Sequence, residues 1–295
     1  MIIAVTGASG FVGSALVPRL VAAGHRVVRI GRGAHADVRW DPSSGQLDAS
    51  RLAGVDAAIN LAGENIAQRW SAQHKRAIRD SRVNGTRLIS ETLASLAQSP
   101  RVLISASAIG IYGDRGNEPL DESSPPGRGF LPEVARQWEA AAEPARRGGI
   151  RVVHPRFGII LGPGGGALAK LLPIFAVGAG GRIASGEQWM SWVARDDVLG
   201  ALEFVVENES LSGPVNFTSP APVTNARFAE ALGHVLHRPA LATVPALAVK
   251  LVYGEMGEET VIAGQKVLPK RLTEAGYHFR HPDLEDALRF ELGRS

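Results

Sequence analysis

The chain has 295 residues, 45% of them hydrophobic and 21% charged, which are the proportions of a soluble globular protein. The formal net charge is only +3, with arginines spread along the chain, and there is no cysteine, which excludes disulfides, thiolate metal sites and a cysteine nucleophile. No apolar run approaches the roughly 18 to 20 residues of a membrane span, and the run 1–5 leads straight into glycines as a first strand does, unlike a signal peptide. We therefore expect a cytoplasmic protein that binds neither a membrane nor nucleic acid.

Short apolar runs alternate with amphipathic segments over the first half, a pattern typical of βαβ units and a parallel sheet. The predicted strands are 2–6, 26–30, 56–63, 101–108 and 151–158, and the predicted helices are 11–23, a stretch ending near 98, and 131–147. Beyond residue 158 the chain has glycine-rich turns, and from residue 227 it is mostly helical. We predict a doubly wound α/β domain over 1–165, with a returning segment near 193–218, and a small, mostly helical C-terminal substrate cap over 166–192 and 219–295.

Three glycines follow the first predicted strand and open the first predicted helix, which is the context of a dinucleotide-binding turn. Gly7 would allow the tight turn, Gly10 the close approach of a pyrophosphate, and Gly13 the packing of helix on strand. The N–H groups near Phe11 and Val12 would then face the phosphates at the positive end of the helix. The alternative is a glycine-rich turn without a ligand.

The end of the second strand indicates which dinucleotide is bound. An NAD-binding unit usually has Asp or Glu there, about 20 residues after the glycines, to bind the ribose 2′-hydroxyl. In this chain Gly31 and Arg32 occupy the place. A guanidinium suits a 2′-phosphate through forked, charge-assisted hydrogen bonds, so the sequence favours NADP(H) over NAD. Arg32 as a solvated loop residue is the alternative.

Several segments give the chain a more specific resemblance. NLAG (60–63), SASAIGIYG (105–113) and PRFGIILGP (155–163) resemble those of extended short-chain dehydrogenase/reductases, the relatives of sugar-nucleotide epimerases and dehydratases. Longer stretches, such as INLAGENIAQRWSAQHKRAIRDSRVNGT and GQKVLPKRLTEAGYHF, are similar to an atypical branch known as epimerase family proteins. The resemblance spans essentially the whole chain and implies a Rossmann fold with a C-terminal substrate region, without supplying the reaction or the substrate.

The catalytic pair of that superfamily, Tyr-x-x-x-Lys on one helix, is absent. None of the three tyrosines, at positions 112, 253 and 277, is followed by lysine four residues later. The helix expected to carry the pair, GFLPEVARQWEAAAE, has no pair of residues that reproduces it, and its Arg136 is a poor proton shuttle because it is always charged. Two asparagines usual in extended enzymes are replaced by Arg82 and Ile159, which weakens any expectation of a nucleotide-sugar substrate. Arg82 would either add a second cation near the cofactor or lie on a helix surface.

Two residues are candidates for catalysis. Ser107 lies at the end of the strand that carries the superfamily's catalytic serine or threonine, and its hydroxyl could bond a substrate carbonyl. Its spacing to Tyr112 is one residue longer than usual, so Ser105 remains an alternative, as does a serine that bonds its own backbone. Tyr112 matches the tyrosine of the VYG loop and is the candidate substitute acid; alternatively it lines the pocket without transferring a proton. Water or a cofactor ribose hydroxyl could also relay the proton.

Two tryptophans lie where extended enzymes contact substrate. Gln188, Trp189 and Trp192 in GEQWMSW would suit an apolar ligand, or would form a hydrophobic seam between the domain and the cap. His234 and His237, and again His278 and His281, are spaced by three residues without a carboxylate in a convincing frame, so we predict no metal site. The segment GPGGGALAK does not fit a phosphate loop of the type Gly-x-x-x-x-Gly-Lys-Ser/Thr and is expected to begin the cap.

These observations predict an NADP(H)-dependent oxidoreductase or epimerase-like enzyme with an unusual proton donor, acting on a small substrate; an oligomer is possible. The alternative is a non-catalytic NADP(H)-binding sensor or regulatory protein. The predicted catalytic residues are Ser107 and Tyr112. The predicted cofactor-binding residues are Gly7, Ser9, Gly10, Phe11, Val12, Gly13, Gly31, Arg32, Leu61, Ala62, Gly63, Arg82 and Arg156.

Overall fold

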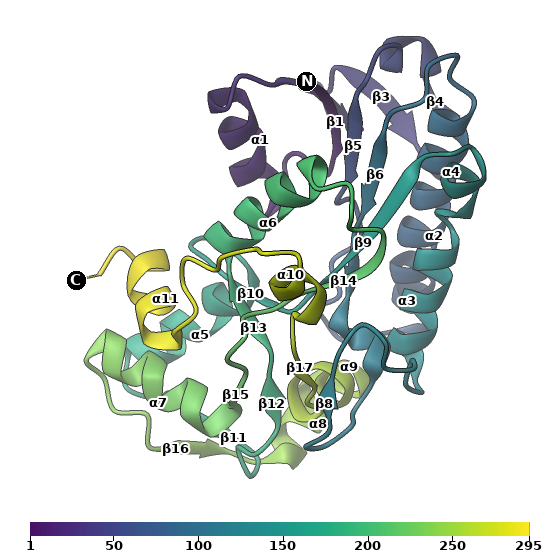
Figure 1. Cartoon of the computed structure of the whole chain (residues 1–295). Helices are drawn as coiled ribbons and strands as arrows, with labels where there is room; N and C mark the ends of the chain where they lie inside the picture. The colour runs from purple at the N-terminus through teal and green to yellow at the C-terminus, as the bar shows by residue number, and fades with distance from the viewer. Residues whose placement is uncertain (295) are drawn as a thin grey trace.

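A computed structural model of the chain, which describes residues 1–294, is built around one large sheet (Figure 1). Its strands are β1 (Ile2–Thr6), β2 (Arg26–Gly31), β3 (Val38–Asp41), β4 (Gln46–Leu47), β5 (Ala57–Asn60), β6 (Val102–Ser105), β7 (Ser107–Ala108), β9 (Arg151–Phe157) and β14 (Gly213–Phe217). They lie in the order β14-β9-β6-β5-β1-β2-β3-β4, with β7 beside β9; only β4 is antiparallel to its neighbour. This is the predicted doubly wound order, in which the chain starts at β1 and winds outward in both directions.

Helices cover both faces of this sheet. On one face lie α1 (Gly13–Ala22) and α6 (Arg195–Glu207), and on the other α2 (Ala72–Ala94), α3 (Phe130–Ala140) and α4 (Glu143–Arg147) (Figure 1). Strand β1 shows why: Ile3 and Val5 pack in the core under α1 and α6, whereas Ala4 packs in the separate core under α2 and α4. Alternate side chains of a strand point to opposite faces, so a strand that is buried throughout needs a helical layer on each side.

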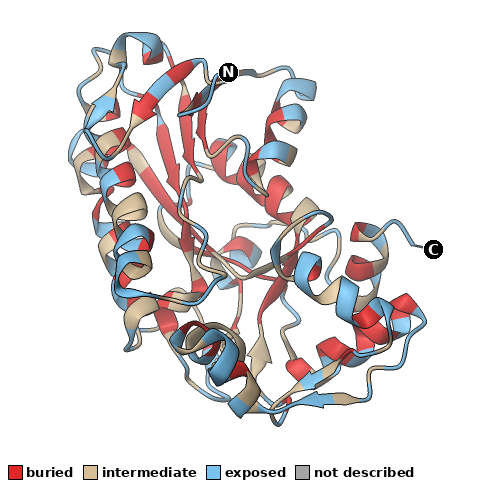
Figure 2. Ribbon diagram, turned by 180° about the vertical axis from the view of Figure 1, so that it is seen from behind, coloured by how far each residue is buried: buried red, intermediate tan, exposed pale blue. Residues whose placement is uncertain are grey.

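The cap lies beyond the carboxyl ends of the parallel strands (Figure 1). It contains α5 (Gly166–Ala176), α7 (Asn225–Leu236), α8 (Ala246–Tyr253), α9 (Glu255–Gly257), the π-helical turn η3 (Glu258–Ile262), α10 (Lys270–Glu274) and α11 (Leu284–Glu291). Short strand pairs connect them: β10 (Ile159–Leu161) with β13 (Trp192–Ala194), β11 (Gly181–Ile183) with β16 (Ala242–Val244), β12 (Trp189–Met190) with β15 (Val223–Thr224), and β8 (Pro119–Leu120) with β17 (Lys266–Val267). Buried side chains continue from the sheet into the centre of this cap (Figure 2).

The structure differs from the predicted elements in several places: the predicted strand 56–63 is shorter, since β5 ends at Asn60, and the predicted strand 101–108 is two strands, β6 and β7. The predicted helix 131–147 is two helices, because α3 ends at Ala140 and α4 begins anew with Pro144 near its start, where a missing N–H is tolerated. The first helix begins at Gly13, because residues 7–12 form the turn itself. The short strand β3 and the turns η1 (Ala49–Leu52) and η2 (Ile109–Tyr112) had no clear sequence signal. Within residues 1–294, no helix is long and apolar enough to cross a membrane.

Candidate functional site

The glycine turn between β1 and α1 is packed so closely that side chains are excluded from it. Gly7 has a φ of +67°, and a Cβ atom added there would lie 2.8 Å from the backbone carbon of Leu61. A Cβ atom on Gly13 would overlap the carbonyl oxygen of Gly7. The N–H of Gly10 donates to that same oxygen over 2.9 Å and closes the turn. Both Gly7 and Gly13 are therefore required by the backbone path itself.

The first turn of α1 is open to a ligand. Ser9 and Gly10 are exposed, and among the hydrogen bonds of the described residues the N–H groups of Phe11 and Val12 donate none. These amides lie at the positive end of a ten-residue helix, where N–H groups without an intrahelical acceptor favour an anion. The turn thus fits the phosphates of a dinucleotide, with backbone donors present and side chains excluded at the close contacts.

The glycine-rich segment 162–166 has a packing role beside this turn. The ring of Phe11 lies so close that a Cβ atom on Gly165 would overlap it, and a Cβ atom on Gly162 or Gly166 would lie 3.1 Å from it. The guanidinium of Arg195 lies 5.2 Å from the centre of the same ring. The start of the cap therefore rests directly on the phosphate turn, consistent with the expectation that this segment is not a second phosphate loop.

A buried network joins the turn to the neighbouring strand β5. Thr6 Oγ1 donates to Asn60 Oδ1 over 2.6 Å and accepts hydrogen bonds from the amides of Leu61 and Ala62 at 3.1 and 3.2 Å. Asn60 Nδ2 in turn donates to Thr86 Oγ1 over 2.9 Å. The backbone of residues 61–62 is therefore fixed directly beside Gly7.

Arg82 forms the wall behind the same loop. Its guanidinium lies 3.2 Å from the Cβ position of Gly63, 4.9 Å from the centre of the Trp138 ring, and donates to the carbonyl oxygens of Glu64 and Ile78. Burial lowers the pKa of Arg82 to about 10, partly offset by the charge of Glu64. Arg82 therefore packs against the loop 63–64 and does not extend freely from the helix surface.

Arg32 follows the end of β2 and is exposed. Gly31 is paired in register with Arg39 of β3, so a second arginine lies at this edge of the sheet. Both cations lie at the carboxyl end of β2, where the ribose next to the adenine is bound in dinucleotide-binding folds.

A chain of hydrogen bonds connects the two candidate catalytic residues. Ser107 Oγ donates to Glu139 Oε1 over 2.7 Å, and Arg156 donates to both carboxylate oxygens of Glu139, at 2.8 and 2.9 Å. Arg156 also donates to the Tyr112 hydroxyl over 2.9 Å, and Tyr112 donates to Asn216 Oδ1 over 2.7 Å. The structure thus brings together Ser107 and Tyr112 of one predicted segment and Arg156 of another.

Sequence reasoning missed Glu139 and Asn216. Glu139 lies on α3, the helix expected to carry the missing pair, and the only signal was a carboxylate next to Trp138 on the apolar side of that helix. Asn216 lies on the returning strand β14, and nothing in its local sequence indicates that it reaches Tyr112.

The charges in this chain stabilise one another. Burial alone would raise the pKa of Glu139, but the hydrogen bonds and positive charge of Arg156 outweigh it and hold this pKa below its usual value. Arg156 is 6% exposed; burial opposes its charge, but the bonds to Glu139 raise its pKa further. Burial raises the pKa of the fully buried Tyr112, and the nearby Arg156 only partly opposes this. The group at neutral pH is therefore a carboxylate, a guanidinium and a neutral phenol.

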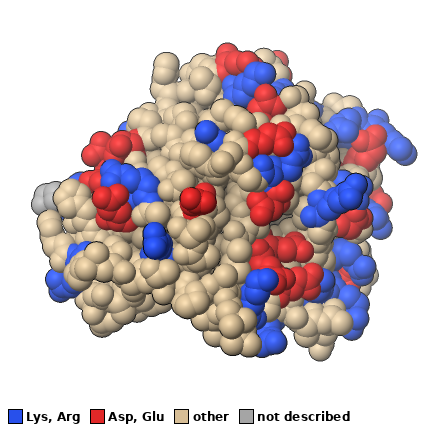
Figure 3. Space-filling model, turned by 90° about the horizontal axis from the view of Figure 1, so that it is seen from below, with Lys and Arg blue, Asp and Glu red and all other residues tan. Residues whose placement is uncertain are grey.

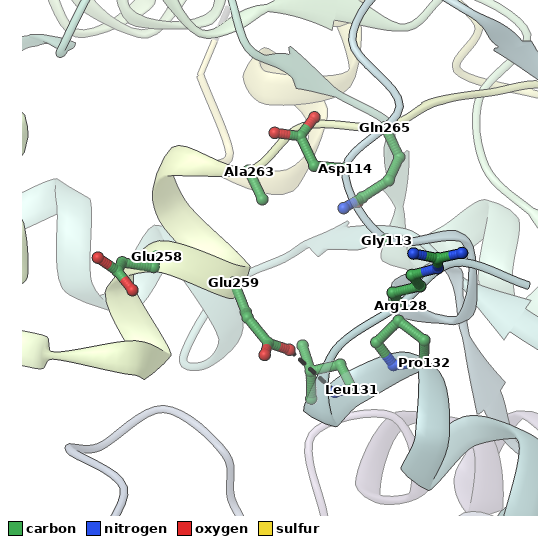
Figure 4. Close-up of a pocket in the computed structure, with 10 residues that line it drawn as sticks. Gly113, Asp114, Arg128, Leu131, Pro132, Glu258, Glu259, Ala263 and Gln265 are labelled. Atoms are coloured by element: carbon green, nitrogen blue, oxygen red, sulfur yellow. Dashed lines mark hydrogen bonds between the residues drawn. The ribbon is translucent and has the colours of Figure 1, made fainter.

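A cavity of about 200 Å³ lies between η2, the first turn of α3 and η3 (Figure 4), and Ser107, Tyr112, Glu139 and Arg156 are not among the residues that line it. It begins at Gly110 of η2, directly after Ser107 and its strand, and continues past the first turn of α3 to η3 of the cap. Its lining consists of Gly110, Gly113, Asp114, Arg128, Leu131, Pro132, Glu258, Glu259, Ala263 and Gln265. It lies at the carboxyl ends of the strands, where doubly wound folds bind their ligands.

The two tryptophans have different surroundings. Trp192 is fully buried in the core of the cap, and its Nε1 donates to the carbonyl oxygen of Ala221, so it is a core residue of the cap and not part of a ligand pocket. Trp189 is half-buried and donates to Asn117, while Gln188 donates to backbone oxygens of Ile183 and Val261. Within residues 1–294 no group of three His, Asp or Glu side chains is arranged to hold a metal.

Comparison with known families and proteins gives matches over nearly the whole chain. Residues 3–217 match the NAD dependent epimerase/dehydratase family, and residues 244–291 match a domain of unknown function (DUF1731). An epimerase family protein of Mycobacterium tuberculosis is 43% identical over 99% of this chain and 98% of its own length. The human epimerase family protein SDR39U1 is 35% identical over 98% of this chain and 99% of its own length.

Solved structures agree with these matches. The crystal structure of human SDR39U1 (isoform 2) with NADPH has a TM-score of 0.91 and 32% identity, and the match covers 100% of both chains. A nucleoside-diphosphate sugar epimerase from Corynebacterium glutamicum has a TM-score of 0.83 and 35% identity over 99% of this chain and 58% of its own. A UDP-glucose 4-epimerase from Thermotoga maritima, at 19% identity and a TM-score of 0.79, shares the fold.

Proposed function

Because the chain belongs to the NAD dependent epimerase/dehydratase family, we propose that it binds NADP(H) and transfers a hydride between the nicotinamide and a small substrate in the cavity between η2, α3 and η3. The observation that carries the proposal is the closed glycine turn with free amides, followed along the same sheet edge by Ser107 and that cavity. The NADPH in the structure of human SDR39U1 supports the choice of cofactor.

In this proposal, different residues contact different parts of the cofactor. The amides of Phe11 and Val12 would hold the pyrophosphate, and Ser9 and Gly10 would lie against it. Arg32, with Arg39 beside it, would bind the 2′-phosphate. The ribose and nicotinamide half would lie against the loop 61–63, which Arg82 supports from behind. Arg156 would border the same half of the cofactor indirectly, by way of its bonded partner Glu139. The cofactor supplies the hydride, and the protein supplies position and charge.

Ser107 and Tyr112 take different parts in this proposal. The proton of Ser107 is directed to the Glu139 carboxylate, so its oxygen presents lone pairs and would accept a hydrogen bond from a ligand. The hydroxyl of Tyr112 is already bonded to Arg156 and Asn216. Tyr112 would therefore act as a positioning residue that holds Arg156, and through it Glu139 and Ser107, while water supplies the substrate proton.

Titration of the purified protein with NADPH and NADH, followed by tryptophan fluorescence, tests the cofactor. We expect NADPH to bind more tightly, and Arg32→Ala to remove most of that preference with little effect on NADH. Arg26→Ala is the matched control, because Arg26 is also an exposed arginine but lies at the opposite end of β2. Equal binding of the two nucleotides by the wild type, or an unchanged preference in Arg32→Ala, would refute the assignment.

Two observations favour a second function, a non-catalytic NADP(H) sensor: α3 carries no Tyr-x-x-x-Lys, and Tyr112 is fully buried. The two functions differ in whether NADPH is consumed. A panel of small carbonyl compounds, monitored by NADPH absorbance, should show turnover for the enzyme that decreases in Ser107→Ala. Tight NADPH binding without turnover of any compound would favour the sensor.

A further inference from the structure

The cavity at the first turn of α3 contains a carboxylate in an unusual place. Glu259 Oε1 accepts from the N–H of Phe130 over 3.0 Å, and its Oε2 accepts from the N–H of Leu131 over 2.9 Å. Glu259 comes from η3, about 130 residues further along the chain, and reaches across the cavity to this helix end (Figure 4). It therefore occupies the amides that would otherwise attract an anion to the 11-residue helix α3.

The other charges around the cavity do not restore an anion site. Among the residues that line it, Asp114 and Glu258 are acidic, and Arg128 is the one cation. Glu258 is bonded to Lys250 at 2.8 Å and points away from the cavity, which leaves Asp114 and Glu259 against Arg128 (Figure 4). On the face seen from below, acidic side chains and basic side chains lie next to one another around a hollow (Figure 3). A phosphate group would meet two carboxylates and no free helix amides.

The volume of the cavity favours a ligand that is small as well as phosphate-free. The cavity encloses about 200 Å³, which is less than the roughly 300–1,000 Å³ typical of pockets that enclose drug-sized ligands. A nucleoside diphosphate bearing a sugar is larger than such a ligand and carries two negative phosphates. Neither its size nor its charge matches this cavity.

We propose that Glu259 determines substrate specificity by blocking the N-terminus of α3, so that the substrate is a small, phosphate-free carbonyl or hydroxyl compound that is uncharged or positively charged. The inference rests on the proposed function, because it assumes that this cavity holds the substrate. It separates the chain from nucleotide-sugar chemistry, although a structural relative is named as a nucleoside-diphosphate sugar epimerase. The side chain of Gln265 extends into the cavity and would hydrogen-bond such a substrate, and Asp114 lines the cavity next to it (Figure 4).

The test measures binding of two probes, UDP-glucose and glycolaldehyde phosphate, to the protein saturated with NADPH, by isothermal titration calorimetry. Saturation with NADPH keeps the probes out of the phosphate turn and shows independently whether the cofactor assignment holds. We expect no binding of either probe to the wild type at millimolar concentration. Glu259→Ala, which frees the amides of Phe130 and Leu131, should bind glycolaldehyde phosphate at least tenfold more tightly than the wild type, whereas UDP-glucose should still be excluded by its size.

Two variants complete the design. Glu259→Gln keeps an acceptor for one amide but loses the charge, and it should show a smaller gain if Glu259→Ala does not fold. Glu255→Gln is the control, because Glu255 lies in the same segment but bonds Lys75 outside the cavity, so its probe binding should equal that of the wild type. Where turnover is found, glycolaldehyde should be preferred over glycolaldehyde phosphate, and Glu259→Gln should narrow that preference.

The outcomes separate the two proposals. If NADPH does not bind, the proposed function fails before any probe is added. If NADPH binds and the wild type also binds UDP-glucose below millimolar concentration, the inference on Glu259 is overturned while the proposed function stands. It is likewise overturned if neither Glu259 variant gains affinity for a probe.

Discussion

Replacing Glu139 by alanine should destabilise the protein more than any other single charge removal on α3. The Glu139 carboxylate accepts hydrogen bonds from Nε and Nη2 of Arg156. The side chain of Glu139 is only 15% exposed and that of Arg156 only 7%. Removing one partner of a buried pair leaves the other charge uncompensated, which typically costs roughly 3–5 kcal/mol. Because Glu139 is not fully buried, we expect a value near the lower limit, about 3 kcal/mol. With a urea m-value of about 3 kcal/mol per M, the midpoint would fall by roughly 1 M.

The measurement is urea unfolding at pH 7, followed by tryptophan fluorescence, for the wild type, Glu139→Ala and a control. Glu133→Ala is the matched control, since Glu133 lies on the same helix and pairs with Arg136, but both side chains are about half exposed. An exposed pair contributes roughly 0–1 kcal/mol. Equal losses in the two variants would refute the claim that burial makes the Glu139–Arg156 pair different.

The same pair predicts a pH dependence. The pKa of Glu139 in the folded protein lies below its usual value of 4.5, because the bonds and charge of Arg156 outweigh burial. A carboxyl group with a lowered pKa stabilises the folded state above its unfolded pKa and loses that contribution as pH falls through the folded value. The difference in unfolding free energy between the wild type and Glu139→Gln should therefore be constant above about pH 5 and shrink below pH 4.5. A difference that grows toward low pH would contradict this sign.

Two further changes test the packing around the site. Gly13→Ala should lower stability by roughly 1–3 kcal/mol and abolish NADPH binding, because its Cβ would overlap the carbonyl oxygen of Gly7; Gly33→Ala, with open space around it, should change neither in the same titration. Asp197→Ala should cost about 2 kcal/mol or more and make residues 277–283 sensitive to protease, because the buried carboxylate accepts from the amides of Arg280 and His281 at 2.7 and 3.0 Å. Unchanged NADPH affinity in the first variant, or unchanged proteolysis in the second, would contradict these explanations.

The features that were predictable from the sequence are those that short segments encode. The glycine turn is one, since its spacing and its position between a strand and a helix are local, and Gly7 and Gly13 are required by contacts to the adjacent loop and within the turn. The order of the sheet is another, because alternating apolar runs and helices leave few topologies. Trp192 could not be assigned locally, because the same tryptophan suits a pocket wall or a core, and only the packing of α7 and α11 against it decides.

The missed site residues are those whose partners are far away in the chain. Glu139 meets Arg156 across a helix–strand contact, Asn216 meets Tyr112 over 104 positions, and Glu259 meets Phe130 over 129 positions. A charged residue on an otherwise amphipathic helix has no local mark that separates a buried partner from a solvated one. The position of each became clear only from the tertiary contacts.

The absence of the tyrosine–lysine pair is built into the packing of α3. Leu131 and Ala135 are spaced as such a pair would be, but Ala135 is 4% exposed and packs in a core with Ile111, Tyr112 and Val267. A lysine there would bury an ammonium group among apolar side chains, which is costly without a partner charge. Val267 and Glu259 both come from the C-terminal region that matches the domain of unknown function, and together they close the side and the N-terminal end of this helix. Two substitutions on α3 would not restore acid–base chemistry of the usual kind, because Val267 of the C-terminal region packs in the space that a lysine side chain at position 135 would need.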